Sequence, residues 1–331
     1  MLVALGEGRL PVHATSFEAA STFLTGPTAG VESSLKVSPS NSSRGRRSPA
    51  TPQEHDMATL GERNSVLISV ISTLIFLCLT IHASAQEYQV IEVARGGTIA
   101  GTVKWSGPVP PQVKLPVSKD PQICDPEGKK SRDLERLVIG PTGGIANTVV
   151  FLKQVTRGKA WDIPPARQTV DQRTCRYEPH IMLVPDNANL RMKSSDATLH
   201  TLHMSGAENF NIAFPFQSQY ITREMTHPGV VDIKCNAGHV WMNGELLVVP
   251  HPYYAVTDEQ GRFRLTNVPP GEYTIEAWHE GWRVSRDEAV LDVGAQVRVH
   301  RPVYSAPKTW EKQVNVPPDG EVNVNFTISQ D

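Results

Sequence analysis

Apolar and polar residues alternate over short stretches along most of the chain after residue 86. Examples are TIAGTVKW (98–105), NTVVFLKQV (147–155), GELLVVP (244–250) and EYTIEAW (272–278), and Gly, Pro, Asn and Asp punctuate the sequence between such segments. A two-residue period is typical of strands with one buried face, and no stretch keeps the 3.6-residue apolar period of a helix. The pattern therefore predicts an all-β protein built from sandwich-type sheets.

The first 85 residues follow other patterns. Residues 1–56 are rich in Ser, Pro, Gly and Thr, which predicts disorder. From residue 57 the chain shows the charged Arg63, an apolar run at 66–81 and an A-x-A motif at 83–85. This order predicts a signal peptide over 57–85, translation from residue 57, and a periplasmic or secreted protein. A retained membrane anchor is the alternative, although 16 apolar residues are few for a spanning helix.

Charge and cysteine content narrow the possible functions. The formal net charge is −2 and no basic stripe is present, which argues against nucleic-acid binding. Of four cysteines, Cys78 lies in the predicted signal, so three remain in an oxidising compartment. Cys124 and Cys175 both stand in turn-like contexts, and we predict that they form a disulfide, which leaves Cys235 free. The alternative is that one of these two thiols binds a metal together with His180.

The strand VVDIKC (230–235) predicts the direction of the free thiol. Val231, Ile233 and Cys235 share one face of this strand, so the cysteine should point inward. Asn236-Ala237-Gly238 reads as a turn, and His239 and Met242 follow on the loop. A thiolate, an imidazole and a thioether are thus predicted to converge from one short loop.

The segment DATLHTLHM (196–204) offers a further imidazole. On a strand, His200 shares its face with Leu202 and Met204, whereas His203 points the other way. The apolar partners indicate that the His200 side faces inward. Thiolate and thioether suit Cu(I), and imidazole suits both oxidation states.

These residue types predict one mononuclear type 1 (blue) copper site with the ligands His200, Cys235, His239 and Met242. His239, at the domain edge, would carry electrons out. The main rival metal is zinc, held by His200, His203, Cys235 and His239. The remaining alternative is structural: an inert buried thiol, a core histidine and a methionine that fills a gap.

Two segments resemble the cupredoxins, the plastocyanin-like copper proteins: EPHIMLVPDNANLRMKSSDATLHTLHM (178–204) and HPGVVDIKCNAGHVWMNGELLVV (227–249). Asp196 and His200 match the family's Asp and first ligand histidine. The resemblance implies copper as cofactor, the same four ligands, and a redox partner protein, for which a cytochrome is one candidate. The spacing Cys-x3-His-x2-Met is short on its methionine side, which makes Met242 the least secure ligand. A two-copper centre would need a second cysteine in this loop.

A second resemblance concerns the flanking segments GGTIAGTVKWSGPVPP (96–111), GGIANTVVFLK (143–153) and AVTDEQGRFRLTNVPPGEYTIEAWHEGW (255–282). They are similar to carboxypeptidase-regulatory-like domains, which are small transthyretin-like β-sandwiches. The exported chain as a whole resembles bacterial envelope proteins that join the two kinds of domain.

The resemblances predict a domain order with an insertion. A cupredoxin-like domain at 165–250 would divide a carboxypeptidase-regulatory-like sandwich into parts at 92–158 and 251–303. A C-terminal strand at 304–331 would complete either sheet. Tandem domains are the alternative.

No nucleophile elbow, zinc-protease motif or phosphate loop occurs, so we do not expect an enzyme. The sequence predicts an exported copper protein for one-electron transfer or copper handling. One alternative is an envelope binding or adhesion module without a redox role. Another is a copper-dependent oxidase or reductase subunit, which would need a further metal centre that the sequence does not offer.

Overall fold

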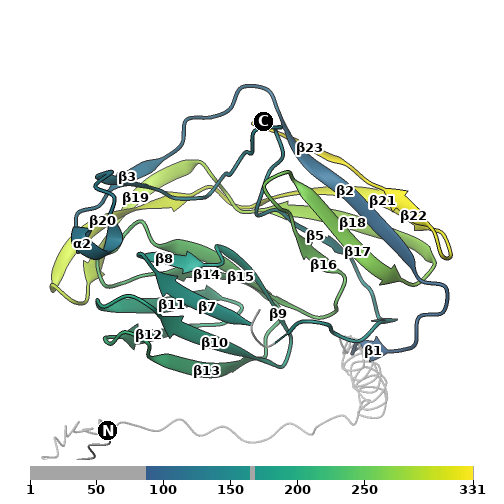
Figure 1. The fold of residues 1–331 in the computed structure, drawn as a ribbon, viewed down its shortest axis with the longest axis horizontal. Coiled ribbons are helices and arrows are strands. Elements are labelled where there is room, and N and C mark those ends of the chain that lie inside the picture. The colour runs from purple at the N-terminus through teal and green to yellow at the C-terminus, as the bar shows by residue number, and fades with distance from the viewer. Residues whose placement is uncertain (1–86, 165–167, 331) are drawn as a thin grey trace, which may run out of the picture. The chain divides into compact units, whose positions relative to one another are not determined.

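The computed structural model describes residues 87–164 and 168–330 (Figure 1). The predicted disordered segment at 1–56, the predicted signal at 57–85 and Cys78 lie outside the described residues. The all-β prediction is confirmed: the described part consists of strands, turns and one four-residue helix, α2 (Pro121–Cys124). Within that part, no helix has the length and hydrophobicity needed to cross a membrane.

Nine strands between residues 169 and 249 form what we call the central sandwich (Figure 1). Its four-stranded sheet has the order β13 (Tyr220–Met225), β10 (Ala188–Ser194), β7 (Thr169–Arg173) and β8 (Arg176–Glu178). Its five-stranded sheet has the order β12 (Phe210–Phe214), β11 (His200–Gly206), β14 (Gly229–Lys234), β15 (Asn243–Val249) and β9 (Ile181–Pro185). Inward residues of both sheets, such as Leu190, Met192, Leu202 and Val231, are fully buried in one core.

Two further sheets form what we call the flanking sandwich. One has the order β16 (Tyr254–Val256), β5 (Val149–Leu152), β18 (Gly271–His279) and β21 (Lys308–Val316). The other has the order β17 (Arg262–Val268), β2 (Gly97–Ser106) and β22 (Glu321–Asn323), and β23 (Phe326–Ser329) also pairs with β2. In the chain, β2 and β5 precede the central sandwich and the other strands follow it, yet Tyr254 pairs directly with Phe151.

Gly261 fixes the turn that leads into β17. Its φ is +74°, and a Cβ at this position would lie 2.1 Å from the carbonyl oxygen of Val103. Only glycine adopts this conformation without strain and also leaves room for the backbone of β2. The turn from Asp258 to Gly261, closed by a hydrogen bond from the amide of Gly261 to the carbonyl oxygen of Asp258, therefore brings β17 against the strand that it pairs with.

Strand pairing differs from the predicted ranges in three places. Within 251–303, β19 (Val284–Asp292) and most of β20 (Val297–Tyr304) pair with each other and belong to neither flanking sheet. The C-terminal segment contains three strands of the flanking sandwich, because the Pro-Pro-Asp-Gly turn at 317–320 separates β21 from β22. Within 92–158, the segment with β3 (Lys114–Pro116), α2 and β4 (Ser131–Asp133) is no part of the flanking sheets. Cys124 and Leu134 from this segment are instead buried in the core of the central sandwich.

Two small ribbons complete the described strands. β1 (Gln89–Val90) pairs with β6 (Arg157–Gly158), and β19 (Val284–Asp292) pairs with β20 (Val297–Tyr304) in a long hairpin. The hairpin lies beside β3 and α2 in Figure 1. A hydrogen bond of 2.8 Å from the amide of Val293 to the carbonyl oxygen of Asn236 joins its tip to the loop after β14.

The two sandwiches share an apolar contact and a buried polar cluster. Val149 and Trp278 of the flanking sandwich pack against Ile181, Leu247 and Val249 of the central one. Such a contact holds the two sandwiches together by removing apolar surface from water.

Arg136 is the centre of the buried polar cluster. Its guanidinium lies 2.7 Å from Oε2 of Glu280 and 3.5 Å from Oε1 of Glu245, and it stacks over the ring of Tyr304. Burial favours a higher pKa for Glu280, but His180 and Arg136 outweigh it and hold this pKa below its usual value. Burial raises the pKa of Glu245 well above its usual range.

Candidate metal centre

The predicted ligands come from two neighbouring strands of the five-stranded sheet and the loop beyond one of them. His200 is the first residue of β11, and Cys235 follows the last residue of β14. Because β11 and β14 are paired, with Met204 opposite Ile233, their ends bring these two side chains together. His239 and Met242 lie on the loop between β14 and β15. All four side chains are buried, as the strand parity predicted for His200 and Cys235.

Three of the four predicted ligands converge. One nitrogen each from His200 and His239 and the sulfur of Cys235 all lie within 4.8 Å of one another. The two imidazole rings meet edge to face, with centroids 4.5 Å apart. A thiolate and two imidazoles in one buried space are a donor set for a soft or borderline metal ion.

Each imidazole has one nitrogen engaged by a carboxylate. Nε2 of His200 lies 2.9 Å from Oδ2 of Asp196, and Nε2 of His239 lies 3.0 Å from Oδ2 of Asp120. Nδ1 of His239 lies 3.7 Å from the sulfur of Cys235. Nδ1 of His200 is buried and has no hydrogen-bond partner among the described residues. Metal-binding histidines usually have this arrangement, in which a carboxylate orients the ring and leaves the second nitrogen for the metal.

The metal-free site balances its charges internally. Burial by itself would raise the pKa of the Cys235 thiol, but the neighbouring imidazoles of His200 and His239 outweigh this and put the pKa well below its usual value. Burial lowers the pKa of His200, but Asp196 and Cys235 have the larger combined effect and raise it to about 9. A lowered pKa favours the thiolate, the form of cysteine that binds metals.

Backbone and hydroxyl donors surround the sulfur. The amides of Thr201 and Ala237 each donate to it at 3.4 Å, and the hydroxyl of Thr201 lies 3.8 Å away. Hydrogen bonds to a ligand sulfur stabilise negative charge on it and so tune a metal's reduction potential. Thr201 is therefore a functional candidate that the sequence patterns did not single out.

Met242 is buried, and its amide donates to the carbonyl oxygen of His239 at 2.9 Å. This hydrogen bond closes the short turn between the two residues. Met242 stays a predicted ligand on the grounds of sequence.

Two other histidines are separate from this centre. His203 is half-buried on the opposite face of β11 from His200, and it belongs to none of the donor groups among the described residues. His180 pairs with Glu280 in the polar cluster between the sandwiches. The predicted disulfide partners Cys124 and Cys175 are joined to each other.

His239, predicted at the domain edge as the route for electrons, has a completely buried side chain. Asp120, immediately before α2, lies against its outer nitrogen. The hairpin of β19 and β20 is hydrogen-bonded to the adjoining loop. The covering residues are distant in sequence from the central sandwich, so strand patterns within that sandwich gave no sign of them.

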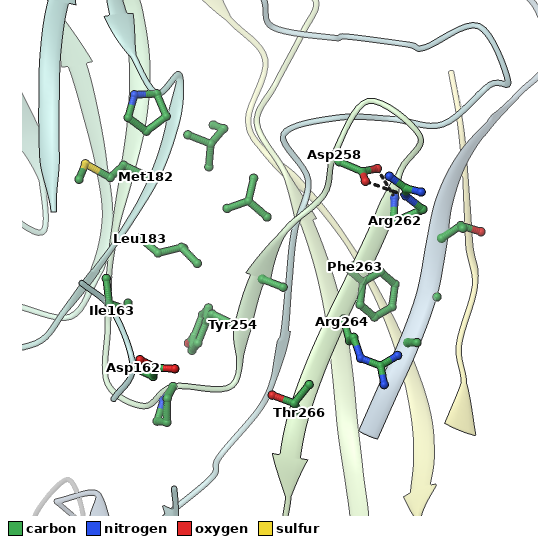
Figure 2. Close-up of a pocket in the computed structure, with 18 of the residues that line it drawn as sticks. Asp162, Ile163, Met182, Leu183, Tyr254, Asp258, Arg262, Phe263, Arg264 and Thr266 are labelled. Carbon is green, nitrogen blue, oxygen red and sulfur yellow. Dashed lines mark hydrogen bonds and ion pairs between the residues drawn. The ribbon is translucent and has the colours of Figure 1, made fainter. Parts of the chain in front are cut away.

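A wide cleft lies elsewhere in the molecule (Figure 2). It has a volume of about 1130 Å³ and is lined by β9 on one side and by β2, β16 and β17 on the other. Leu183 faces it from β9, whereas Arg262 and Arg264 belong to its opposite wall (Figure 2). Both arginines already pair with carboxylates, Asp258 and Glu321 respectively. These two arginines of the cleft are therefore not free to bind a charged ligand. The buried group of His200, Cys235 and His239 is the stronger candidate site.

Comparisons with known proteins agree with a β-sandwich architecture. A family model described as the second β-sandwich domain of NOMO1-like subunits of the BOS complex matches residues 253–302. No curated protein matches the chain.

Solved structures with partial similarity include several copper proteins. A Cu-containing nitrite reductase from Thermus scotoductus is 19% identical over 28% of this chain and 24% of its own, with a TM-score of 0.24. The chain thus spans about a quarter of that enzyme. A reduced mutant of amicyanin is 22% identical over 24% of this chain and 80% of its own, with a TM-score of 0.22. A purple cupredoxin from Nitrosopumilus maritimus is 15% identical over 24% and 98%, with a TM-score of 0.23. Similarity at this level carries no argument about the site.

Proposed function

We propose that the protein binds one copper ion as a type 1 centre and uses it for one-electron transfer or copper handling. His200, Cys235 and His239 would be the strong ligands, and Met242 the weak one. Copper in such a site would alternate between Cu(I) and Cu(II) with little rearrangement of its ligands. We further propose a non-enzymatic carrier, exported to the periplasm or cell exterior, that exchanges electrons with a redox protein.

The observation that carries this proposal is the unsatisfied Nδ1 of His200. A buried polar atom without a partner is costly, and native proteins rarely keep one without a reason. Here the atom belongs to His200, which forms with Cys235 and His239 a group that could hold a metal ion, with one donor atom of each residue within 4.8 Å of the others. A bound metal ion would remove the penalty and would compensate the thiolate charge.

The proposal is tested by adding one equivalent of Cu(II) to the metal-free protein. We expect an intense thiolate-to-copper absorption at roughly 600 nm, the signature of a blue-copper site. Cys235→Ser should abolish it. His200→Asn should weaken or abolish it, whereas His203→Asn is the matched control on the same strand and should leave it unchanged.

The other outcomes identify the rival functions. Stoichiometric zinc binding, with no colour after copper addition, would indicate the zinc site. A protein that binds neither metal, with a normally folded spectrum, would refute the metal function and favour the adhesion module.

A further inference from the structure

The predicted centre is completed by a short segment from outside the central sandwich. We call residues 119–124 the strap; it contains Lys119, Asp120 and helix α2. Oδ2 of Asp120 lies 3.0 Å from Nε2 of His239 and also accepts a hydrogen bond of 2.7 Å from the hydroxyl of Thr198. Asp120 is partly exposed, whereas His239 is completely buried. The strap thus places a carboxylate between the predicted ligand and solvent.

The strap is held at both of its ends. At one end, Cys124 forms a disulfide with Cys175, and both residues are completely buried. The two sulfurs lie within 4.8 Å of each other and of a nitrogen of His239, so the disulfide is next to the site that the strap covers.

At the other end, Nζ of Lys119 lies 2.6 Å from Oδ2 of Asp292 at the tip of the hairpin. Asp292 packs closely on the ligand loop: a Cβ added to Gly238 would lie 2.1 Å from the same carboxylate oxygen. Gly238 also has a φ of +82°, so the loop needs glycine there for both reasons. A second hairpin contact, from Arg301 to Oδ1 of Asn236 at 2.7 Å, joins the hairpin to the residue after Cys235.

We propose that the strap is a disulfide-locked cover of the metal centre, in which Asp120 is a positioning residue that orients His239. With the strap locked, Cys235 and His239 are shielded from solvent, and a metal ion enters or leaves only when the strap opens. The part of the proposal that concerns metal rests on the proposed copper function. The part that concerns shielding of Cys235 is independent of any metal.

The shielding is tested on the metal-free protein by the rate at which a small aromatic disulfide reagent labels Cys235, with the labelled peptide identified by mass. We compare the wild type with the double variant Cys124→Ser/Cys175→Ser, which leaves no new thiol in the strap. The disulfide restricts the conformational freedom of the loop that it closes. Without it, opening of the strap can be favoured, and labelling of Cys235 accelerated, by up to on the order of 1000-fold. We expect at least a tenfold acceleration.

A control separates opening of the strap from general loss of stability. Gly261→Ala strains a turn of the flanking sandwich and does not touch the strap. At a temperature where both variants are folded, Gly261→Ala should label Cys235 at the wild-type rate. Equal labelling rates in the wild type and the double serine variant would refute the cover. If the double variant does not fold, Lys119→Ala, which frees the other end of the strap, replaces it with the same expected direction.

Two measurements on the copper-loaded protein complete the test. Transfer of Cu(I) to a strong chelator should accelerate in the strap variant by a factor similar to that for labelling. Asp120→Asn keeps the size and the disulfide but removes a negative charge next to His239, so it should raise the reduction potential. An unchanged potential would refute the positioning role of Asp120. If no copper binds, the proposed function fails, and the labelling rates still decide whether the strap is a cover.

Discussion

The ion pair of Arg136 allows one to measure how burial changes the contribution of an ion pair to the free energy of unfolding. Among the described residues, the pairs Arg136 with Glu280 and Arg95 with Asp319 have the same nitrogen–oxygen distance of 2.7 Å. Their surroundings differ strongly. Arg136 and Glu280 are 8% and 0% exposed, whereas Arg95 and Asp319 are 69% and 59% exposed. We therefore compare Arg136→Met with Arg95→Met, since methionine keeps the length of the side chain and removes its charge.

The structure predicts a large difference between the two variants. Loss of Arg136 leaves the ionised Glu280 buried without its cationic partner, which costs about 3–5 kcal/mol in comparable cases. Its guanidinium also stacks 4.2 Å from the ring centre of Tyr304, a contact that adds about 0.5–2 kcal/mol. Loss of Arg95 should cost less than about 1 kcal/mol, because water screens the exposed pair.

The assay is urea-induced unfolding at neutral pH, followed by tryptophan fluorescence and analysed from midpoints and slopes. The double variant Arg136→Met/Glu280→Gln should be more stable than the sum of its single variants predicts, because no ionised carboxylate of this pair remains buried. Equal losses for Arg136→Met and Arg95→Met, or strict additivity in the double variant, would contradict the reasoning.

Two further predictions concern single side chains. Burial lowers the pKa of His251 to about 4. The unfolded chain therefore takes up a proton at this residue below about pH 6.5, while the folded protein resists protonation down to about pH 4. The free energy of unfolding should therefore fall as the pH decreases through this window. His251→Asn, which keeps an acceptor for the amide of Tyr253, should reduce this fall. Urea midpoints at pH 7 and pH 4.5 measure the loss of stability in both proteins. Met242→Leu should cost less than about 1.5 kcal/mol, retain copper and raise its reduction potential, as measured by redox titration; complete loss of copper would mean that Met242 is a principal ligand.

Strand parity was sufficient to predict the inner half of the candidate site. A two-residue period has only two faces, so the apolar neighbours of Cys235 and His200 determine which way each side chain points. The structure buries both side chains and brings their donor atoms together. The two cysteines in turn-like contexts, Cys124 and Cys175, are likewise joined in the structure.

The outer half of the site could not be predicted in this way. Asp120 contacts His239, which lies 119 residues later in the chain. Asp292 belongs to a hairpin that follows the ligand loop in sequence, and it also packs on that loop. No local period encodes such contacts, because they depend on how the segments fold over the central sandwich. The one available sign was the cysteine pattern, since a disulfide from Cys124 to Cys175 carries Asp120 toward the central sandwich. Strand parity says nothing about the outer side of His239, because this residue lies on a loop.

The pairing of β2 has a consequence for how the molecule is made. Its neighbours β17, β22 and β23 all begin at residue 262 or later, so the flanking sandwich cannot close until the last ten residues have been synthesised. The strands of the central sandwich are contiguous in the chain, and their contacts can form earlier. We expect the pocket of His200, Cys235 and His239 to assemble while the flanking sandwich is still open, and the hairpin of β19 and β20 to reach it afterwards. The strap precedes the central sandwich in the chain, so the hairpin would be the last part of the wall around this pocket to be placed.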